Sequence, residues 1–155
     1  MLTSFPKPML FAHRGASAYA PENTIAAFEL ALQQFKNQPP AIELDAKLSR
    51  DGQVFVFHDL TVERTTNGKG KISDFTLQQL QELDAGSYFD QRFLGEKIPT
   101  LDSVFEVVGT KAFINVELTN YATPRDGLNE HIAELVIRHN LMKNVIFSSF
   151  LPDNL

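Results

Sequence analysis

The sequence has 155 residues, of which 43% are hydrophobic, and its formal net charge is −5. This length and this hydrophobic share are typical of one folded domain and exclude a disordered chain, so we expect residues 1–155 to form a single domain. The negative charge argues against nucleic acid as a partner, and the absence of cysteine excludes disulfides and thiolate metal sites.

No segment of the sequence is typical of an export signal or a membrane anchor. Residues 1–8 contain two prolines and lack the apolar core of a signal peptide, and no apolar run approaches the length of a membrane span. We therefore expect a cytoplasmic protein with no membrane span. The oligomeric state is left open by the sequence.

Short apolar stretches alternate with segments in which apolar residues recur at helical spacing. The helical segments are residues 25–35, which Pro39-Pro40 ends, and residues 77–83, 101–108 and 128–139. The stretches predict strands over residues 9–12, 41–48, 54–57, 112–118 and 145–147, of which the first is expected to be buried. This alternation indicates parallel βαβ units and an α/β fold. Asp51-Gly52 marks a hairpin-like turn before the third strand.

Residues that can carry chemistry gather at or near the carboxyl ends of these strands. In a (β/α)8 barrel such strand ends meet on one face, where the active site lies. Alternation along residues 41–48 places Glu43, Asp45 and Lys47 on one side of the strand. That pattern alone also fits a half-solvated edge strand with its polar face in water. The candidate site residues are His13, Arg14, Glu43, Asp45, His58 and Glu117.

These residue types together favour metal-assisted chemistry on a phosphate. Carboxylates such as Glu43, Asp45 and Glu117 suit a hard cation, Mg²⁺ or Ca²⁺, better than zinc. His13 and His58 could act beside the cation as general base and general acid. Arg14 offers a planar fork that complements an anion, and Gly15 lets the backbone come close to a ligand. A metal-assisted phosphoryl transfer uses all of these parts.

A series of short motifs closely resembles the glycerophosphodiester phosphodiesterases, from about Leu10 to the last residue. The absence of a signal peptide makes the resemblance greatest to the cytoplasmic bacterial branch. In order, the motifs are His13-Arg14-Gly15, Pro21-Glu22-Asn23-Thr24, Glu43-x-Asp45, Asp51-Gly52, His58-Asp59, Thr66-Asn67-Gly68, Asp84-Ala85-Gly86, Ile98-Pro99-Thr100-Leu101, Asn115-Val116-Glu117 and Ser149-Phe150.

The resemblance implies a (β/α)8 TIM barrel of the phosphodiesterase type and a divalent cation, Mg²⁺ or Ca²⁺. It implies hydrolysis of glycerophosphodiesters, which are small-molecule substrates, to an alcohol and glycerol 3-phosphate. By position, His13 and His58 would be the acid/base pair and Arg14 would hold the phosphate. In the family's reaction the neighbouring glycerol hydroxyl attacks phosphorus, and water then opens the cyclic phosphate. The metal ligands would be Glu43, Asp45 and Glu117.

The sequence departs from the family pattern at two points. The family usually carries a lysine two residues after the third metal-ligand glutamate, and here that position is Thr119, so one cationic contact is missing or comes from elsewhere. The chain also reaches only the fifth strand, which implies a barrel truncated after that strand and a domain incomplete at its C-terminus. Glu22 and Asn23 are interpreted as helix-cap and scaffold residues.

Two other functions remain open on the sequence. One is a metal-dependent barrel enzyme that acts on sugars or carboxylic acids, for which an arginine beside a histidine is less needed. The other is a non-catalytic or inactive barrel fragment that binds a metal or a partner without turnover, because part of the barrel is missing.

Overall fold

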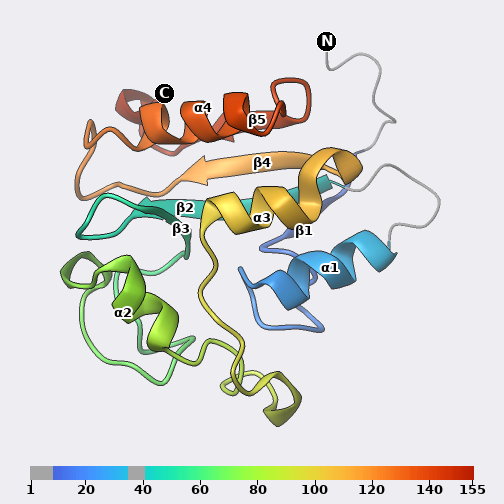
Figure 1. Ribbon diagram of the computed structural model, residues 1–155, viewed down its shortest axis with the longest axis vertical. Coiled ribbons are helices and arrows are strands. Elements are labelled where there is room, and N and C mark those ends of the chain that lie inside the picture. Colours follow the sequence, from blue (N-terminus) through green and yellow to red (C-terminus); the bar gives the residue numbers. More distant parts are fainter. Residues whose placement is uncertain (1–8, 35–40) are drawn as a thin grey trace.

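The computed structural model, which describes residues 9–34 and 41–155, is built on one twisted sheet (Figure 1). The strands are β1 (Phe11–His13), β2 (Ala41–Leu48), β3 (Val54–Val56), β4 (Phe113–Leu118) and β5 (Val145–Ser148). Their spatial order is β1-β2-β4-β5, and β3 pairs with β2 outside this row. All neighbours in the row are parallel. The α/β organisation predicted from the sequence is therefore present.

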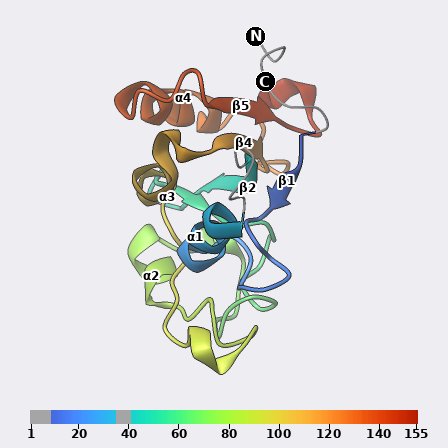
Figure 2. The ribbon, with the colours of Figure 1, turned by 90° about the vertical axis from the view of Figure 1, so that its right-hand side faces the viewer.

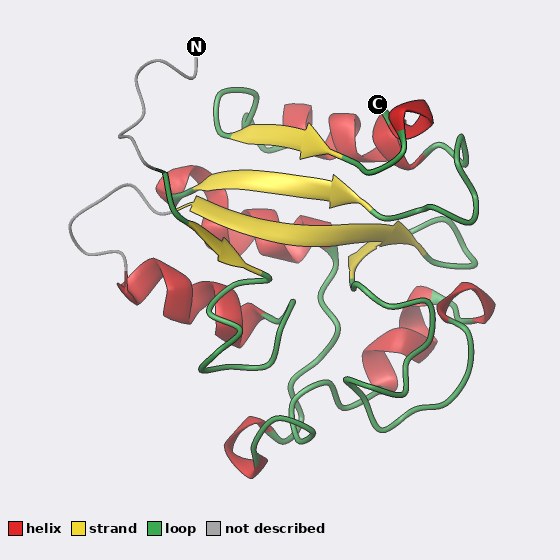
Figure 3. Ribbon diagram, turned by 180° about the vertical axis from the view of Figure 1, so that it is seen from behind, coloured by secondary structure: helices red, strands yellow, loops and turns green. Residues whose placement is uncertain are grey.

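Three helices cover one face of the sheet, and the opposite face carries no helix in the described part of the chain (Figures 2 and 3). These helices are α1 (Ile25–Gln34), α3 (Leu101–Val108) and α4 (Leu128–Arg138), while α2 (Leu77–Glu82) lies in the long excursion between β3 and α3. Short 3₁₀ turns complete the structure at Ile72–Asp74, Gln91–Phe93, Gly109–Lys111 and Pro152–Asn154. The predicted helix-face residue Phe35, the stop at Pro39-Pro40 and residues 1–8 lie outside the described residues.

The helix-covered face of the sheet holds the main hydrophobic core. Alternate residues of β2 and β4 point into it and pack on α3 and α4, because successive strand side chains face opposite ways. A second apolar cluster lies under the excursion from β3 to α3. The core therefore fixes which face of β2 and β4 carries the polar residues. The core residues from these two strands include Ile42, Leu44, Ala46, Ile114, Val116 and Leu118.

The third strand differs from the expectation of parallel units throughout. β3 runs antiparallel to β2, with Leu48 opposite Val54. The hairpin turn predicted at Asp51-Gly52 explains this direction, since Gly52 adopts a φ of 74° and the turn is far too short for a parallel crossover. The fifth strand along the chain is thus the fourth parallel strand of the sheet.

The strand predicted over residues 9–12 was expected to be buried, and this expectation is wrong. Leu10 is 61% exposed and Phe11 is 39% exposed. The reason is that β1 lies at one end of the strand row and, within the described residues, pairs with β2 alone. β5 lies at the other end, and Ile146 and Phe147 are 37% and 38% exposed.

Candidate active site

Strand register brings the predicted site residues to one face of the sheet. His13 of β1 is opposite Glu43 of β2, and Asp45 is opposite Glu117 of β4. Residues paired in this way point to the same side of a sheet. That side is the one not covered by α1, α3 and α4 (Figure 3). The four side chains therefore share a surface near the carboxyl ends of the parallel strands.

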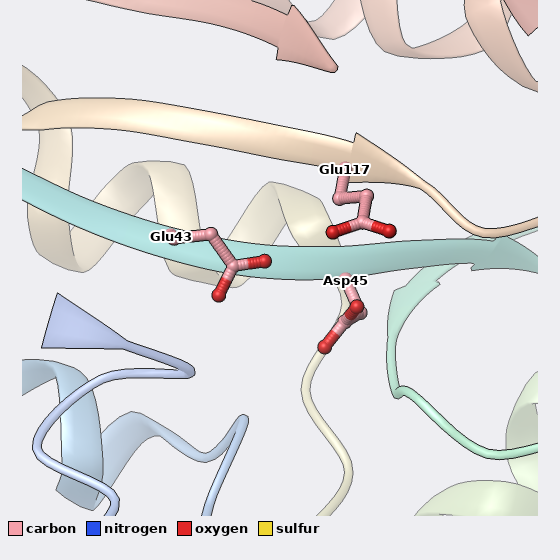
Figure 4. A group of neighbouring side chains, drawn as sticks. All are labelled: Glu43, Asp45 and Glu117. Atoms are coloured by element: carbon pink, nitrogen blue, oxygen red, sulfur yellow. The ribbon is translucent and has the colours of Figure 1, made fainter. Parts of the chain in front are cut away.

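The carboxylates of Glu43, Asp45 and Glu117 converge, with ligand oxygens that all lie within 4.8 Å of one another (Figure 4). Glu43 is 7% exposed and Asp45 only 1%. Burial raises the pKa of Glu43 to about 7, and the neighbouring charges of Asp45 and Glu117 add to the effect. Such crowding of buried carboxylates is unfavourable unless a cation offsets it.

One oxygen of this group has the environment of a metal ligand. Oε1 of Glu43 is buried and has no hydrogen-bond partner among the described residues. A buried carboxylate oxygen without a partner carries a desolvation cost that metal coordination would remove. The all-oxygen donor set fits a hard divalent cation. The described residues thus contain an acidic group able to hold such an ion.

Arg14 lies beside this group in a tight left-handed turn. Arg14 and Gly15 have φ values of 56° and 79°. The Arg14 backbone N–H donates to Oε2 of Glu43 at 3.0 Å, and its Nε lies 3.3 Å from Oδ2 of Asp45. This Nε makes no hydrogen bond within the described residues, although it is buried. The guanidinium is therefore held next to the carboxylates with a donor still available.

Gly15 has a packing role that the sequence did not indicate. A Cβ at this position would lie 2.8 Å from the backbone carbonyl carbon of Ala27. The glycine therefore allows the Arg14 turn to pack closely on α1, and the close approach of its backbone to a ligand remains a prediction.

The two candidate histidines are both accessible at this end of the sheet. Nε2 of His13 lies 3.8 Å from Oε2 of Glu43, and the His13 side chain is 67% exposed. His58 is 41% exposed, and its Nδ1 lies 2.7 Å from Oδ1 of Asp59. Because a carboxylate only accepts, we assign the proton to Nδ1, which leaves Nε2 for proton transfer. The β2–β3 hairpin positions His58, since the Phe57 N–H donates to the Asp45 carbonyl at 2.9 Å.

Sequence reasoning missed a chain of ion pairs that links Arg14 to His58. Nη1 of Arg14 donates to Oε1 of Glu22 at 2.8 Å. Arg64 donates to both oxygens of Glu22 and also, through Nε and Nη2, to Asp59. Asp59 in turn holds His58. Burial alone would raise the pKa of Glu22, but the two arginines lower it. Of these contacts, the sequence could have indicated only the one between His58 and Asp59, because these two residues are adjacent.

Two further residues outside the predicted set hold the carboxylates in place. Asn23, with a φ of 58°, donates through Nδ2 to Oδ2 of Asp45 at 2.9 Å. It is not the cap of α1, because Thr24 is the residue whose Oγ1 accepts the Ala27 N–H. Tyr121 donates its hydroxyl hydrogen to Oε1 of Glu117. Burial and this carboxylate raise the pKa of Tyr121.

Two cavities lie where β2 and β4 end. One of about 600 Å³ is lined by His58, Asp59 and Tyr121, among others, and one of about 420 Å³ by Thr119 and Asn120, among others. Lys47 lines both of them. A cavity of about 630 Å³ between the β2–β3 turn and α4 contains none of the candidate site residues. The small-molecule space that adjoins the chemistry is therefore at the carboxyl ends of β2 and β4.

The sheet has parallel strands, helices on one face and polar groups at the carboxyl ends of its strands. This arrangement is typical of a segment of an α/β barrel enzyme. Residues 13–155 match the model of the glycerophosphoryl diester phosphodiesterase family. The chain belongs to this family. The resemblance seen in the sequence motifs is thereby confirmed.

Relatives support the same assignment. The chain is 45% identical over 145 residues to a glycerophosphodiester phosphodiesterase of Caldanaerobacter subterraneus, covering 93% of this chain and 58% of that protein. It is 35% identical to a glycerophosphodiester phosphodiesterase of Bacillus subtilis, covering 99% of this chain and 56% of that protein. The chain thus spans less than two thirds of the length of the curated relatives it matches.

Solved structures show the same fold. The glycerophosphodiester phosphodiesterase of Agrobacterium tumefaciens superposes with a TM-score of 0.83 at 38% identity, covering 94% of this chain and 59% of that chain. A phosphodiesterase of Oleispira antarctica, solved in complex with the product sn-glycerol-3-phosphate, superposes with a TM-score of 0.84 at 37% identity, covering 98% and 60%. The predicted (β/α)8-barrel class, present here in part, is confirmed. In residues 9–34 and 41–155, no helix has the length and apolar character needed to cross a membrane.

Proposed function

We propose that the intact protein hydrolyses glycerophosphodiesters to an alcohol and glycerol 3-phosphate. The observation that carries this proposal is the convergence of Glu43, Asp45 and Glu117 beside Arg14, within a chain of the phosphodiesterase family. The Oleispira relative, whose structure holds sn-glycerol-3-phosphate, supports the same product. A cytoplasmic location, the absence of nucleic acid as a partner and a single domain remain predictions from the sequence.

The cation that we propose is Mg²⁺ or Ca²⁺, held by Glu43, Asp45 and Glu117. The buried, unpartnered Oε1 of Glu43 and the all-oxygen donor set support these ligands. When bound, such an ion neutralises charge on phosphoryl oxygens. Asn23 and Tyr121 keep two of the three carboxylates oriented by their hydrogen bonds.

The protein's own groups then move the protons and hold the phosphate. We propose that one of His13 and His58 takes the proton of the glycerol hydroxyl next to the phosphate-bearing carbon, and that this oxygen attacks phosphorus. The bond to the head-group alcohol breaks, and the other histidine gives that alcohol its proton. Water opens the cyclic phosphate in a second step. Attack from within the substrate gains the large advantage of proximity, and Arg14 complements the phosphoryl charge.

The proposal is tested by assaying the intact protein for release of glycerol 3-phosphate. Glycerophosphocholine and glycerophosphoethanolamine should be cleaved, and EDTA should abolish turnover until Mg²⁺ or Ca²⁺ is added in excess. A diester whose attacking glycerol hydroxyl is replaced by hydrogen is the matched control and should not turn over. Equal cleavage of this control would contradict internal attack. Activity only on sugars or carboxylic acids, or on no substrate, would favour the other enzyme class or a non-catalytic protein.

A further inference from the structure

Lys47 is a buried cation that the proposed reaction has not yet used. It lies on β2, two residues beyond Asp45, so its side chain leaves the same face of the strand as Asp45 and Glu43. The residue is 5% exposed. Its Nζ donates to the Thr119 carbonyl at 2.8 Å. None of the ion pairs formed within the described residues includes Lys47.

The ammonium group is therefore incompletely satisfied. A lysine ammonium has three donors, and the hydrogen bond to Thr119 uses one of them. The ammonium interacts electrostatically with the carboxylates of Asp45, Asp59 and Glu117, and none of them forms an ion pair with it. Burial of a charge is costly unless that charge is paired and hydrogen-bonded. A divalent cation bound by Asp45 and Glu117 would also offset the negative charge of these carboxylates around Lys47. A bound anion would then stabilise the positive charge of the lysine.

Two cavities of a size that can hold an anion border Lys47. Lys47 lines both the cavity of about 600 Å³ that holds His58 and the cavity of about 420 Å³ that holds Thr119. The same side chain thus borders open space together with the candidate acid/base residue His58. No other lysine among the described residues is buried, so Lys47 differs from the solvated lysines of the surface.

We propose that Nζ of Lys47 binds a non-bridging phosphoryl oxygen of the diester, and so acts as a further catalytic residue. This inference rests on the proposed function and adds to it a second cationic contact besides Arg14. It also accounts for Thr119, because the positive charge that position 119 lacks reaches the Thr119 carbonyl from β2. The group bound is a phosphate ester or free phosphate, and the neutral glycerol part makes no use of Lys47.

The test is phosphate binding by the Mg²⁺-loaded intact protein, measured by calorimetry with inorganic phosphate and sn-glycerol 3-phosphate as probes. Lys47→Met removes the charge at similar length, and Lys47→Arg keeps the charge. We expect Lys47→Met to weaken both probes about 10- to 100-fold, the scale of a lost charge-assisted hydrogen bond. Mg²⁺ affinity should not fall, since a positive charge near the carboxylates has been removed. Lys47→Arg should bind phosphate more tightly than Lys47→Met.

Lys69→Met is the matched control, because Lys69 is exposed and its loss changes the net charge equally. It should bind phosphate as the unaltered protein does. Unchanged phosphate affinity in a Lys47→Met variant that still binds Mg²⁺ would overturn the proposal. Should that variant not fold, the lysine Cε and Nζ resonances of the unaltered protein decide, with Lys47 assigned through its contact with Thr119. They should shift when inorganic phosphate is added, and an unchanged Lys47 signal overturns the proposal.

The test of Lys47 and the test of the proposed diesterase function can fail independently. Diesterase activity with phosphate binding unaffected by Lys47→Met would leave the function standing and remove Lys47 from it. A Lys47-dependent phosphate site without diesterase activity would keep Lys47 as a phosphate-binding residue and contradict the proposed function. If both hold, turnover by Lys47→Met should fall through kcat more than through a rise in KM, because charge on the phosphoryl oxygens is greatest in the transition state.

Discussion

Arg64 donates to both carboxylate oxygens of Glu22, with nitrogen–oxygen distances of 2.8 and 2.7 Å, across 42 positions of sequence. The same guanidinium pairs with Asp59 at 2.5 Å. Glu22 also accepts from Arg14, and Asp59 contacts His58. The residue proposed to hold the phosphate and a residue proposed to move protons are therefore positioned by one connected set of charges. Arg64 is the part of this set that joins the two loops.

Replacing Arg64 by lysine should lower kcat about 10- to 100-fold, the range seen when groups that orient functional residues are changed. Lysine keeps the charge but cannot bind two carboxylates with a planar fork. Arg92→Lys is the control, since the Arg92 side chain is 76% exposed and its only ion pair within the described residues is with nearby Asp90. The measurement is steady-state turnover of glycerophosphocholine, and an unchanged kcat in Arg64→Lys would show that the ion-pair chain does not position the site.

Replacing His13 or His58 by alanine in the intact protein should lower turnover about 10²- to 10⁴-fold, the scale of a lost proton-transfer group. Both side chains are largely accessible, at 67% and 41% exposure, so folding should change little. Circular dichroism and Mg²⁺ binding check the fold of each variant. His131→Ala is the control, because His131 is exposed on α4. Full activity of His13→Ala or His58→Ala would remove that residue from the acid/base pair.

Asp59 should make stability depend on pH in the acid range. The hydrogen bond from Arg64 is the largest influence that lowers the pKa of Asp59 from 3.8 to about 2. A depressed carboxylate pKa stabilises the folded state above the unfolded-state pKa, and this stabilisation is lost as pH falls toward the folded-state value. The difference in free energy of unfolding between the unaltered protein and Asp59→Asn should therefore be constant above about pH 5 and shrink between about pH 4 and pH 2.

Urea unfolding at a series of pH values measures that difference. Glu29→Gln is the control, because Glu29 is exposed on α1 and its side chain forms no ion pair or hydrogen bond within the described residues. A difference for Asp59→Asn that stays the same from pH 2 to pH 7 would mean that the Arg64 contact does not persist in solution.

Residues 1–155 expressed alone should self-associate and lack diesterase activity. β1 and β5 are the two ends of the strand row, and both present exposed apolar side chains such as Phe11, Ile146 and Phe147. Unpaired strand edges of this kind pair with other chains. Sedimentation velocity should show dimers or larger species, and Ile146→Lys should shift them toward monomer. Ile137→Lys, at an exposed position of α4, is the control and should not. A sharp monomer that melts cooperatively and turns over substrate would contradict this prediction.

The sequence predicted most of the sheet and the gathering of the carboxylates, because alternation and strand register are local and regular. Glu43 and Asp45 are two residues apart on β2 and so point to the same face. Glu117 joins them because it lies opposite Asp45 on β4. The direction of β3 was predictable from the Asp51-Gly52 turn, which outweighs the general alternation of strands and helices. The metal-ligand and acid/base roles of these residues remain predictions.

The partners that orient the site were not predictable in the same way. Glu22 and Arg64 meet because two irregular loops fold toward each other, and no periodic pattern records such a contact. Asn23 looked like a helix cap, but its left-handed backbone turns the amide to Asp45 and leaves capping to Thr24. Lys47 was visible on the polar side of its strand, yet its burial depends on the loop that follows β4.

The β2–β3 hairpin has a consequence for the order in which the molecule assembles. The hairpin closes through a short turn, so Asp45 and the residues leading to His58 meet at a small cost in loop-closure entropy. The contact between Lys47 and Thr119 spans 72 positions and requires β4 to dock on β2. We therefore expect the hairpin to form early in folding and Glu117 to join late. Divalent cations should then slow unfolding far more than they speed folding, because the complete set of ligands exists only near the native state.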